Sequence, residues 1–416
     1  MARSFSGKAE LTMMKSQNLT QITRQPKGFS LVELMVAIAI GLFLVAGLTM
    51  VFANSSRTYG ELQKAAQQIE NGRLAISILS EDIKNAGQFG DFVMQPPISG
   101  APIAIPGTSP DPCISTSNLA TLKSSLRLAL PLHVQGYGDV TSLPSGLTNC
   151  LTSSTVAKVT SNTDILVVRR GDTLVLVDPE ASQNGGSATT SATPVAGEVY
   201  IQSALTDVAV QVGVAQSIDK TKTAENTAAS LTRKDFTSTP AGTTGGYIRK
   251  LHIHVYFVSD CADADCSSST RNIPTLKRAE LVAGSGGVPV WRIVPLVEGI
   301  ESLQIEYGID TAPATLNAAT GYYGDGTADS FVDAPTATTW DATGWSNVVA
   351  VRLFVLARNT EQTTGYSDSK AYELRRSVAA ATGANSIAAK NDSYKRHVFE
   401  MEVPLINTIN RRLPPS

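Results

Sequence analysis

The strongest constraint on this chain is an uncharged apolar segment near its N-terminus. Residues 34–56 form a run of 23 positions without Asp, Glu, Lys or Arg, and Glu33 is the only charged residue within 29–52. An α-helix rises about 1.5 Å per residue, so about 20 such residues cross the roughly 30 Å hydrocarbon core of a bilayer. The segment predicts one membrane-spanning helix. Since the 416 residues hold no second run of this kind, the pattern excludes a multispan transporter.

Charge on the N-terminal side of the run sets its expected orientation. The first 28 residues carry five bases against one acid, a local charge of +4, with Arg24 and Lys27 nearest the run. Because cytoplasmic flanks carry the excess of Lys and Arg, we expect the N-terminus in the cytoplasm and everything after Arg57 outside it. A secretory signal peptide cut near residues 51–53 and a plain signal anchor are the alternatives. A signal peptide is disfavoured because its apolar core is usually about 7–15 residues long.

The residues at the start of the run form a motif. The stretch KGFSLVEL at residues 27–34 resembles the type III signal of type IV prepilins and pseudopilins. The resemblance implies that prepilin peptidase cuts after Gly28 and methylates the new amine of Phe29. It also implies that Glu33 pairs with a neighbouring subunit's N-terminal amine during assembly. A carboxylate in an apolar membrane segment costs at least about 2.5 kcal/mol unless it is protonated or paired, which agrees with such a role.

Beyond the membrane segment the pattern predicts that the helix continues to residue 89. Leu62, Ile69, Ile76 and Ile83 recur every seven positions, and no Pro interrupts the segment. We expect this stripe to pack on the protein's own sheet rather than in a coiled coil with a partner. Within the stripe, Gly72 permits either a bend or a close backbone approach, and Gly87 suits a left-handed cap at the helix end.

After Gly90 the chain becomes rich in β-branched residues and in turn signals, which predicts strands. Residues 165–168 and 174–177 are expected to form a hairpin around Gly171 and Asp172. Further strands are predicted at 199–202, 251–258, 303–307, 348–357 and 398–403. The Ser/Thr/Gly/Ala-rich segments 181–197 and 215–246 are interpreted as surface loops.

The predicted fold class is α+β, with a type IV pilin-like arrangement. One long N-terminal helix, with a membrane half and an amphipathic half, packs on an antiparallel β-sheet domain with large loops. The expected divisions are a prepilin leader at 1–28, a transmembrane and filament-core helix at 29–56, its amphipathic continuation at 57–89, and an extracytoplasmic head at 90–416.

Several fragments of the head resemble PilW-type minor pilins; they lie at residues 273–278, 296–310, 345–358 and 396–400. The resemblance implies a minor pilin that helps to initiate type IV pilus assembly in a membrane priming complex and at the pilus tip. It implies as partners other minor pilins, a large tip adhesin, the major pilin, the inner-membrane assembly platform and prepilin peptidase. The chain would sit in the bacterial inner membrane with a periplasmic head. Residues 311–323 and 407–410 depart from the family pattern, so tip contacts there are not carried over.

Two other functions remain open. A J-type minor pseudopilin of type II secretion has the same anchor, and a receptor or DNA-binding pilin is a further alternative. The chain after residue 28 holds 29 bases and 35 acids, a charge of −6, which provides no basic field for a phosphate backbone. We therefore expect no nucleic-acid partner.

No motif for catalysis or for a cofactor is found. The chain lacks Gly-x-Ser-x-Gly, a phosphate loop and a dinucleotide fingerprint in a strand-to-helix context. His252 and His254 share one face of a predicted strand, and without nearby Cys such a pair is interpreted as structural. Arg170, Gly171 and Asp172 spell an adhesion tripeptide, which we attribute to chance at a turn. The expectation is a protein without enzymatic activity and without a cofactor.

The four cysteines are candidates for two disulfides, because an exported domain lies in an oxidising compartment. The simplest pairing joins Cys113 to Cys150 and Cys261 to Cys266, although three connectivities are compatible with the sequence. A zinc site is disfavoured, since Cys-x4-Cys has no second Cys or His pair at zinc spacing.

Three acids are the one calcium candidate. Asp325, Asp329 and Asp333 offer hard oxygen ligands but lack the spacing of an EF-hand loop, and an ordinary acidic turn is the alternative.

The motif predicts a mature protein that begins with N-methylphenylalanine at Phe29. The leader of 28 residues is long for this class, and a start at Met13 or Met14 would shorten it without changing the mature product. Intact-mass spectrometry of protein purified from its native membrane checks this expectation. A mass that corresponds to a chain starting at Met1 or at Asn54 would contradict it.

Overall fold

The computed structural model describes residues 28–90, 109–151, 156–178, 189–190, 195–204, 207–213, 247–311, 324–333, 342–374 and 386–412. The chain divides into two compact units, Met1–Gly60 and Glu61–Ser416. Helix α1 (Leu31–Lys84) contributes residues to both. The expected loop at 215–246 and most of the one at 181–197 lie outside the described residues.

The predicted long helix is confirmed, but it ends at Lys84 instead of residue 89. Gly87 follows its end with a positive φ of 73°, as a left-handed cap requires. In the first unit the large apolar side chains of α1 are exposed, for example Phe43 at 81% and Phe52 at 77%. Among the described residues, α1 is the one helix whose length and apolar character suit a membrane crossing. Such a surface requires lipid or other apolar protein around it.

The expectation that the seven-residue stripe packs on the protein's own sheet is wrong for its first half. Leu62 is 64% exposed and Ile69 is 42% exposed, whereas Ile76 is partly buried and Ile83 is fully buried. A strict seven-residue repeat drifts by about 20° per heptad around a straight α-helix. Successive residues of the stripe therefore change gradually from exposed to buried against the head. The face that the head buries contains Gln68, Gly72, Ala75, Leu79, Ser80, Asp82 and Ile83.

The described strands form three antiparallel sheets. The large sheet contains β1 (Val134–Val140), β2 (Thr163–Gly171), β3 (Val177–Asp178), β4 (Thr189–Thr190), β5 (Val199–Ala204), β6 (Asp207–Val212), β7 (Tyr247–Ser259), β8 (Thr275–Ala283) and β9 (Pro289–Glu298). The second contains, in spatial order, β11 (Ser330–Asp333), β10 (Ile300–Ile309), β12 (Val348–Arg358) and β15 (Arg396–Pro404), and β13 (Tyr372–Glu373) pairs with β14 (Ser386–Ile387). Among the described residues, the head also contains the helices α2 (Leu119–Ala129), α4 (Ala342–Ser346) and α5 (Ile406–Arg412), with short 3-10 turns η1 (Ser145–Leu147) and η3 (Ser285–Gly287).

Strand β7 organises the large sheet. One of its edges pairs with β2 and β3, and the other pairs with β5 and β8. The predicted hairpin between 165–168 and 174–177 is therefore wrong, because both segments pair with β7. Gly171 N donates to Gln88 O at 2.7 Å and Asp172 N donates to Lys250 O at 2.8 Å, so the chain continues along β7 instead of reversing. The other predicted strands correspond to β5, β7, β10, β12 and β15.

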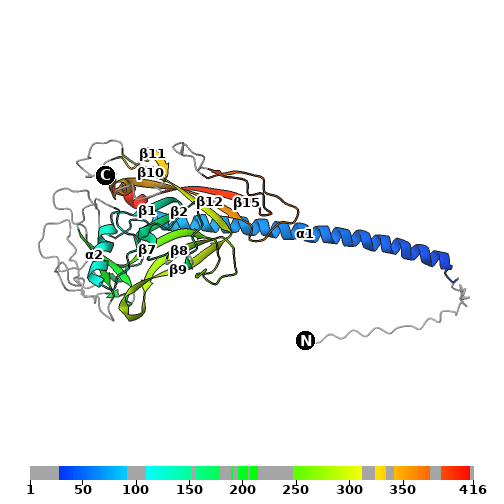
Figure 1. The fold of residues 1–416 in the computed structure, drawn as a ribbon, viewed down its shortest axis with the longest axis horizontal. Helices are drawn as coiled ribbons and strands as arrows, with labels where there is room; N and C mark the ends of the chain where they lie inside the picture. Colours follow the sequence, from blue (N-terminus) through cyan, green and yellow to red (C-terminus); the bar gives the residue numbers. More distant parts are fainter. Residues whose placement is uncertain are drawn as a thin grey trace, which may run out of the picture. The chain divides into compact units, whose positions relative to one another are not determined.

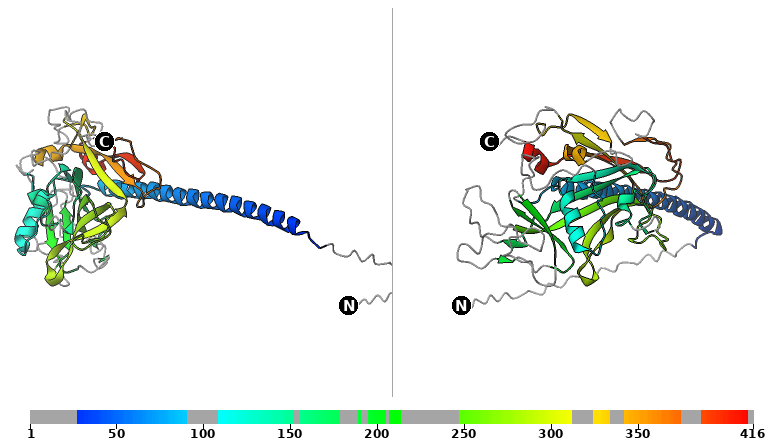
Figure 2. Two further views of the ribbon diagram at one scale, coloured as in Figure 1. Left: turned by 45° about the vertical axis from the view of Figure 1, so that its right-hand side comes forward. Right: turned by 60° about the vertical axis from the view of Figure 1, so that its left-hand side comes forward.

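Both faces of the large sheet are buried, each in its own core. On β2, Leu166 and Val168 face the core shared with α1 and the second sheet, whereas Ile165 and Val167 face the core beneath α2. A strand buried on both faces carries a continuous apolar run, which is why this segment was predictable. Figures 1 and 2 show the strands of both sheets gathered around the C-terminal part of α1.

Gly72 marks the closest approach of α1 to the second sheet. A methyl group at Gly72 would overlap the ring of Phe399 on β15. Of the two roles predicted for this glycine, the structure shows close approach within an unbroken helix.

We expect Gly72→Ala to destabilise the head, although Ala is the better helix former by about 1 kcal/mol. Overpacking against Phe399 costs about 1–3 kcal/mol, so the clash outweighs the gain in propensity. Thermal unfolding of the full chain in detergent, followed by circular dichroism, measures the change. Gly60→Ala is the matched control, since a methyl group there meets no atom within 4 Å. A Gly72→Ala melting temperature at or above that of the control would contradict the close approach.

Candidate functional site

The residues predicted for processing lie at the exposed start of α1. Gly28 and Phe29 precede the helix, Glu33 lies in its first turn, and the Phe29 side chain is 83% exposed. A methyl group on Gly28 would meet no atom within 4 Å. The fold of the subunit therefore imposes no packing requirement for glycine here.

Glu33 also has a local structural role, which must be weighed against the predicted assembly role. Ser30 Oγ accepts a hydrogen bond from Glu33 N at 3.2 Å, and Ser30 O accepts one from Leu34 N at 3.1 Å. Ser30 is thus the N-cap, with Glu33 at the position of a capping-box acid, which contributes about 0.3–1 kcal/mol. An acid in a membrane helix costs about 2.5 kcal/mol or more. Capping alone does not offset that cost.

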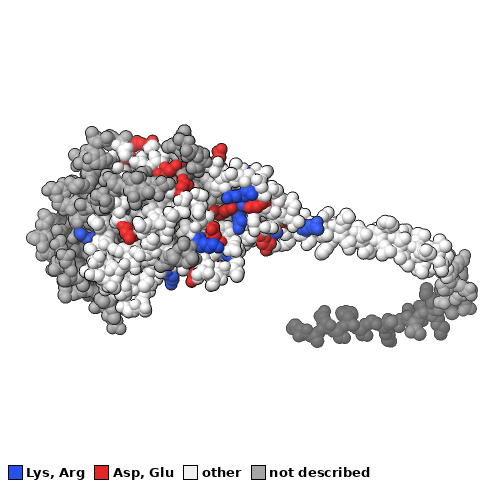
Figure 3. Space-filling model, viewed as in Figure 1, with Lys and Arg blue, Asp and Glu red and all other residues white. Residues whose placement is uncertain are grey.

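Asp82 fastens the other end of α1 to the large sheet. Its buried carboxylate accepts hydrogen bonds from Arg170 Nε at 2.6 Å, His254 Nδ1 at 2.7 Å and Tyr256 Oη at 2.9 Å. Burial raises the pKa of Asp82, but His254 and Arg170 outweigh burial and hold the pKa well below its ordinary value. Figure 3 shows basic and acidic residues interspersed on the visible face of the head.

The two histidines on β7 each contact a carboxylate, as a structural role predicts. His252 Nε2 lies 3.1 Å from Asp172 Oδ2, and the rings of His252 and His254 are 5.3 Å apart. The outer residues of the adhesion tripeptide, Arg170 and Asp172, are thus engaged inside the head. Desolvation lowers the pKa of His252 to about 4, and the hydrogen bond to Asp172 opposes this shift only in part.

The C-terminal helix α5 adds a contact that the sequence did not predict. Asn407, in a segment that departs from the family pattern, donates from Nδ2 to Ala86 O at 3.0 Å and to Lys84 O at 3.4 Å. It therefore satisfies carbonyl groups at the end of α1 that have no partner within the helix. Residues 312–323, within the other departing segment, lie outside the described residues.

The structure joins Cys113 to Cys150 and Cys261 to Cys266, the simplest pairing that the sequence allowed. The second bridge covers Lys277, a fully buried cation that the sequence analysis missed. Lys277 Nζ donates to Asp263 O at 2.5 Å and lies 3.1 Å from Cys266 Sγ. Desolvation lowers the pKa of Lys277 to about 8.

The calcium candidates do not converge. Asp325 Oδ1 accepts Thr327 N at 2.8 Å, Asp329 Oδ2 accepts Thr311 N at 2.7 Å, and Asp333 pairs with β10 through its backbone. Within the described ranges, no three His, Cys, Asp or Glu side chains form a group that could hold a metal ion. The geometry is that of an acidic turn.

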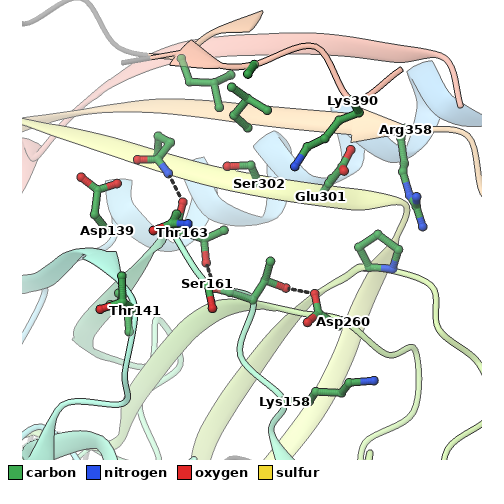
Figure 4. Close-up of a pocket in the computed structure, with 18 of the residues that line it drawn as sticks. Asp139, Thr141, Lys158, Ser161, Thr163, Asp260, Glu301, Ser302, Arg358 and Lys390 are labelled. Atoms are coloured by element: carbon green, nitrogen blue, oxygen red, sulfur yellow. Dashed lines mark hydrogen bonds between the residues drawn. The ribbon is translucent and has the colours of Figure 1, made fainter. Parts of the chain in front are cut away.

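A polar cleft of about 920 Å³ lies where the two sheets meet. Its walls come from residues at the ends of β1, β7 and β12, the starts of β2, β8 and β10, and residues 386–390 (Figure 4). Ser and Thr hydroxyls, amides and charged groups line it, and its described lining residues include no aromatic ring. The sequence analysis missed this cleft because its residues come from separate segments of the chain.

An ion-pair network fixes one wall of the cleft. The buried Arg396 guanidinium binds Glu301 at 2.5 Å, Asp368 at 2.9 Å and Asp392 at 2.7 Å. Burial lowers the pKa of Arg396, but the three carboxylates outweigh burial and raise it above its ordinary value. Because removing one partner of a buried ion pair leaves the other charge uncompensated, this network holds Glu301 in place.

Two segments of the chain match models of known protein families. Residues 255–407 match the family Type IV Pilus-assembly protein W, and residues 23–49 match the prokaryotic N-terminal methylation motif. Among solved structures, the type IV-like pilin TTHA1219 from Thermus thermophilus is similar at 14% identity and a TM-score of 0.21, over 52% of this chain and 86% of that one. No curated protein sequence matches the chain.

An exposed apolar helix that starts within the methylation motif and ends in an antiparallel β head defines a membrane-anchored type IV pilin. Within that class, the match over residues 255–407 supports a minor pilin of the PilW type, which takes part in type IV pilus assembly. The predicted resemblance and the α+β fold are confirmed.

His252 predicts a specific pH dependence of stability. Its folded pKa of about 4 lies below the ordinary value of about 6.5, so the unfolded chain binds the proton first as pH falls. Stability is therefore lost from about pH 6.5 down to about pH 4. Between pH 7 and pH 5 we expect a loss of about 2 kcal/mol, which His252→Gln should remove.

Denaturant unfolding of the full chain at several pH values measures this slope. His397→Gln is the control, because it removes an exposed histidine that lies on β15 of the second sheet. An equal slope in wild type and His252→Gln would show that burial does not control protonation of His252.

Proposed function

We propose that this protein helps to initiate type IV pilus assembly as part of a membrane priming complex that stays at the pilus tip. One observation carries the proposal. The acid Glu33 in the first turn of α1 is followed by an exposed apolar surface without charged residues, whereas the head buries cores of its own. The anchor supports insertion among other subunits. The role is structural, and we assign no enzymatic activity to it.

Processing is the first step of the proposed pathway. Prepilin peptidase hydrolyses the Gly28–Phe29 bond on the cytoplasmic face, and a methyl group is then transferred to the freed amine of Phe29. The exposure of both residues and the absence of any packing requirement at Gly28 support access by such an enzyme. The charge of the leader supports a periplasmic position for the head.

Assembly transfers α1 from lipid into a filament core. Because lipid tails are as apolar as the side chains of α1, this transfer gains little from the hydrophobic effect. A buried carboxylate and a buried amine each carry a large desolvation cost, which a direct pair offsets. The pairing of Glu33 with a neighbour's methylated Phe29 amine would therefore set the register of the subunits.

The exposed part of the helix stripe extends this contact surface beyond the membrane. Leu62 and Ile69 of the stripe are 64% and 42% exposed on the segment of α1 that belongs to the head unit. Pilus components are the general partners of the family. We propose other minor pilins, the major pilin, a large tip adhesin and the inner-membrane platform as the specific ones, with the large head capping the growing filament.

Deletion and complementation test this function. In an organism that encodes the protein, deletion should abolish surface pili and twitching, and the wild-type chain should restore both. Glu33→Gln should fail to restore them, because it keeps the helix cap but removes the charge. Electron microscopy and a motility assay provide the readouts.

Glu70→Gln is the matched control, since it neutralises an exposed acid on the same helix outside the apolar run. It should restore pili fully. Restoration by Glu33→Gln at wild-type level would refute the charge pairing. Loss of enzyme export with pili intact would assign the protein to type II secretion, and immunogold label spread evenly along the pili would refute the tip position.

A further inference from the structure

We propose that the disulfide between Cys261 and Cys266 is a thiol–disulfide exchange site, which an external dithiol reduces while the Lys277 ammonium stabilises the departing sulfur. The bridge lies in the loop that joins β7 to β8. Asp260 and Asn272, near the two ends of this loop, line the polar cleft. All the contacts that define the site lie within the head, so the site is independent of the proposed role in pilus assembly.

A buried cation contacts both sulfur atoms of the bridge. Lys277 is fully buried, and its Nζ lies 3.1 Å from Cys266 Sγ and 3.4 Å from Cys261 Sγ. Its remaining polar contact among the described residues is the carbonyl oxygen of Asp263. A buried ammonium that contacts only neutral groups is poorly compensated, so a negative charge on either sulfur is favoured.

The Lys277 amine keeps its charge at neutral pH. Burial lowers its pKa to about 8, and the nearby carboxylates of Asp263 and Asp265 oppose that shift. Both carboxylates bind other groups. Asp263 accepts a hydrogen bond from Arg271 at 3.1 Å. Asp265 accepts one from Ser267 N at 2.9 Å. The cation therefore contacts the bridge and not an acid.

The other disulfide of the head has different surroundings. Cys113 and Cys150 are 0% and 1% exposed, and both belong to the core beneath α2. The polar contact of Cys150 Sγ in the described chain is the carbonyl oxygen of Leu147 at 3.5 Å, with no cation beside it. This bridge spans a sequence separation of 37 residues, against 5 for the bridge beside Lys277. A bridge that closes a longer loop contributes more to stability, so reduction beside Lys277 costs the fold less.

Cys266 is the half of the bridge that a thiolate attacks. It is 7% exposed, whereas Cys261 is fully buried. The attacking thiolate forms a bond with Cys266 Sγ, and Cys261 Sγ departs with the electron pair of the S–S bond. The departing thiolate lies beside Lys277 Nζ. A cation lowers the pKa of a neighbouring thiol, and a leaving group of lower pKa departs faster.

The second thiol of the dithiol completes the reaction. It attacks the mixed disulfide at the sulfur that belongs to the reductant, closes the reductant into a cyclic disulfide and releases Cys266 with the electron pair. Two electrons pass from the dithiol to the bridge, and the two protons that the dithiol gives up are shared between solvent and the two cysteine sulfurs. A dithiol suits this site because its second step is intramolecular, so no second molecule has to reach a nearly buried sulfur.

Differential alkylation tests the proposal on the full chain in detergent at pH 7. The protein is incubated with dithiothreitol without denaturant, free thiols are trapped with iodoacetamide, and peptide mass spectrometry follows each bridge separately. We expect the bridge between Cys261 and Cys266 to open about tenfold faster than the bridge between Cys113 and Cys150. Equal rates, or earlier opening of the bridge between Cys113 and Cys150, would overturn the proposal.

Lys277→Met tests the cation, because it keeps the length of the side chain and removes the charge. Opening of the neighbouring bridge should slow about tenfold, and its equilibrium constant for reduction in a glutathione buffer should fall by a similar factor. Lys158→Met is the matched control. It removes a lysine whose Nζ contacts the Asn272 amide oxygen instead of a sulfur, and it should exchange as the wild type does.

The direction of the change separates the cation from a packing role. Looser packing around Lys277→Met would speed the opening of the bridge, whereas loss of the cation slows it. Unchanged or faster opening in a folded Lys277→Met variant would refute the role of the cation. Circular dichroism identifies a variant that has not folded, and the comparison of the two bridges in the wild type then decides the proposal. None of these readouts involves Glu33 or piliation, so failure here is distinct from failure of the proposed function.

Discussion

Helix α1 must satisfy two environments along one continuous element, and the rest of the structure follows from that constraint. Its first part has apolar side chains on all sides and no charge between residues 34 and 56, so only lipid or other subunits can cover it. Its second part has one buried face, which the head covers with β2, β7 and the second sheet. Asp82 links this part of α1 to the large sheet, because its carboxylate accepts hydrogen bonds from side chains of two strands.

Sequence periodicity predicted some of this architecture and failed where geometry in three dimensions intervened. The apolar run on β2 was recognisable because that strand is buried on both faces. Strand β1, with two glycines and polar residues, carries no such signal, yet a side chain at Gly136 would overlap the Tyr307 hydroxyl. The apolar residues of the stripe do recur every seven positions. On a straight helix such a repeat shifts gradually around the surface, so its members do not all lie on the buried face.

The two candidate sites differ in how far they could be predicted. The processing motif is local, so residues 28–33 carry it without help from the fold. The cleft is assembled from strand ends far apart in the chain, and its chemistry depends on which charges are already paired. Glu301 and Lys390 both line it, and the buried Arg396 binds both oxygens of the Glu301 carboxylate.

The sequence by itself determined the membrane anchor, the processing motif, the antiparallel β character of the head and the family. Each depends on neighbouring residues or on a period of two to four, and such patterns are visible in one dimension. The tertiary structure alone decided which strands pair with β7, which face of α1 is buried, and that a polar cleft forms between the sheets. Those features depend on contacts between residues far apart in the chain. Such contacts form only when the head has folded around α1.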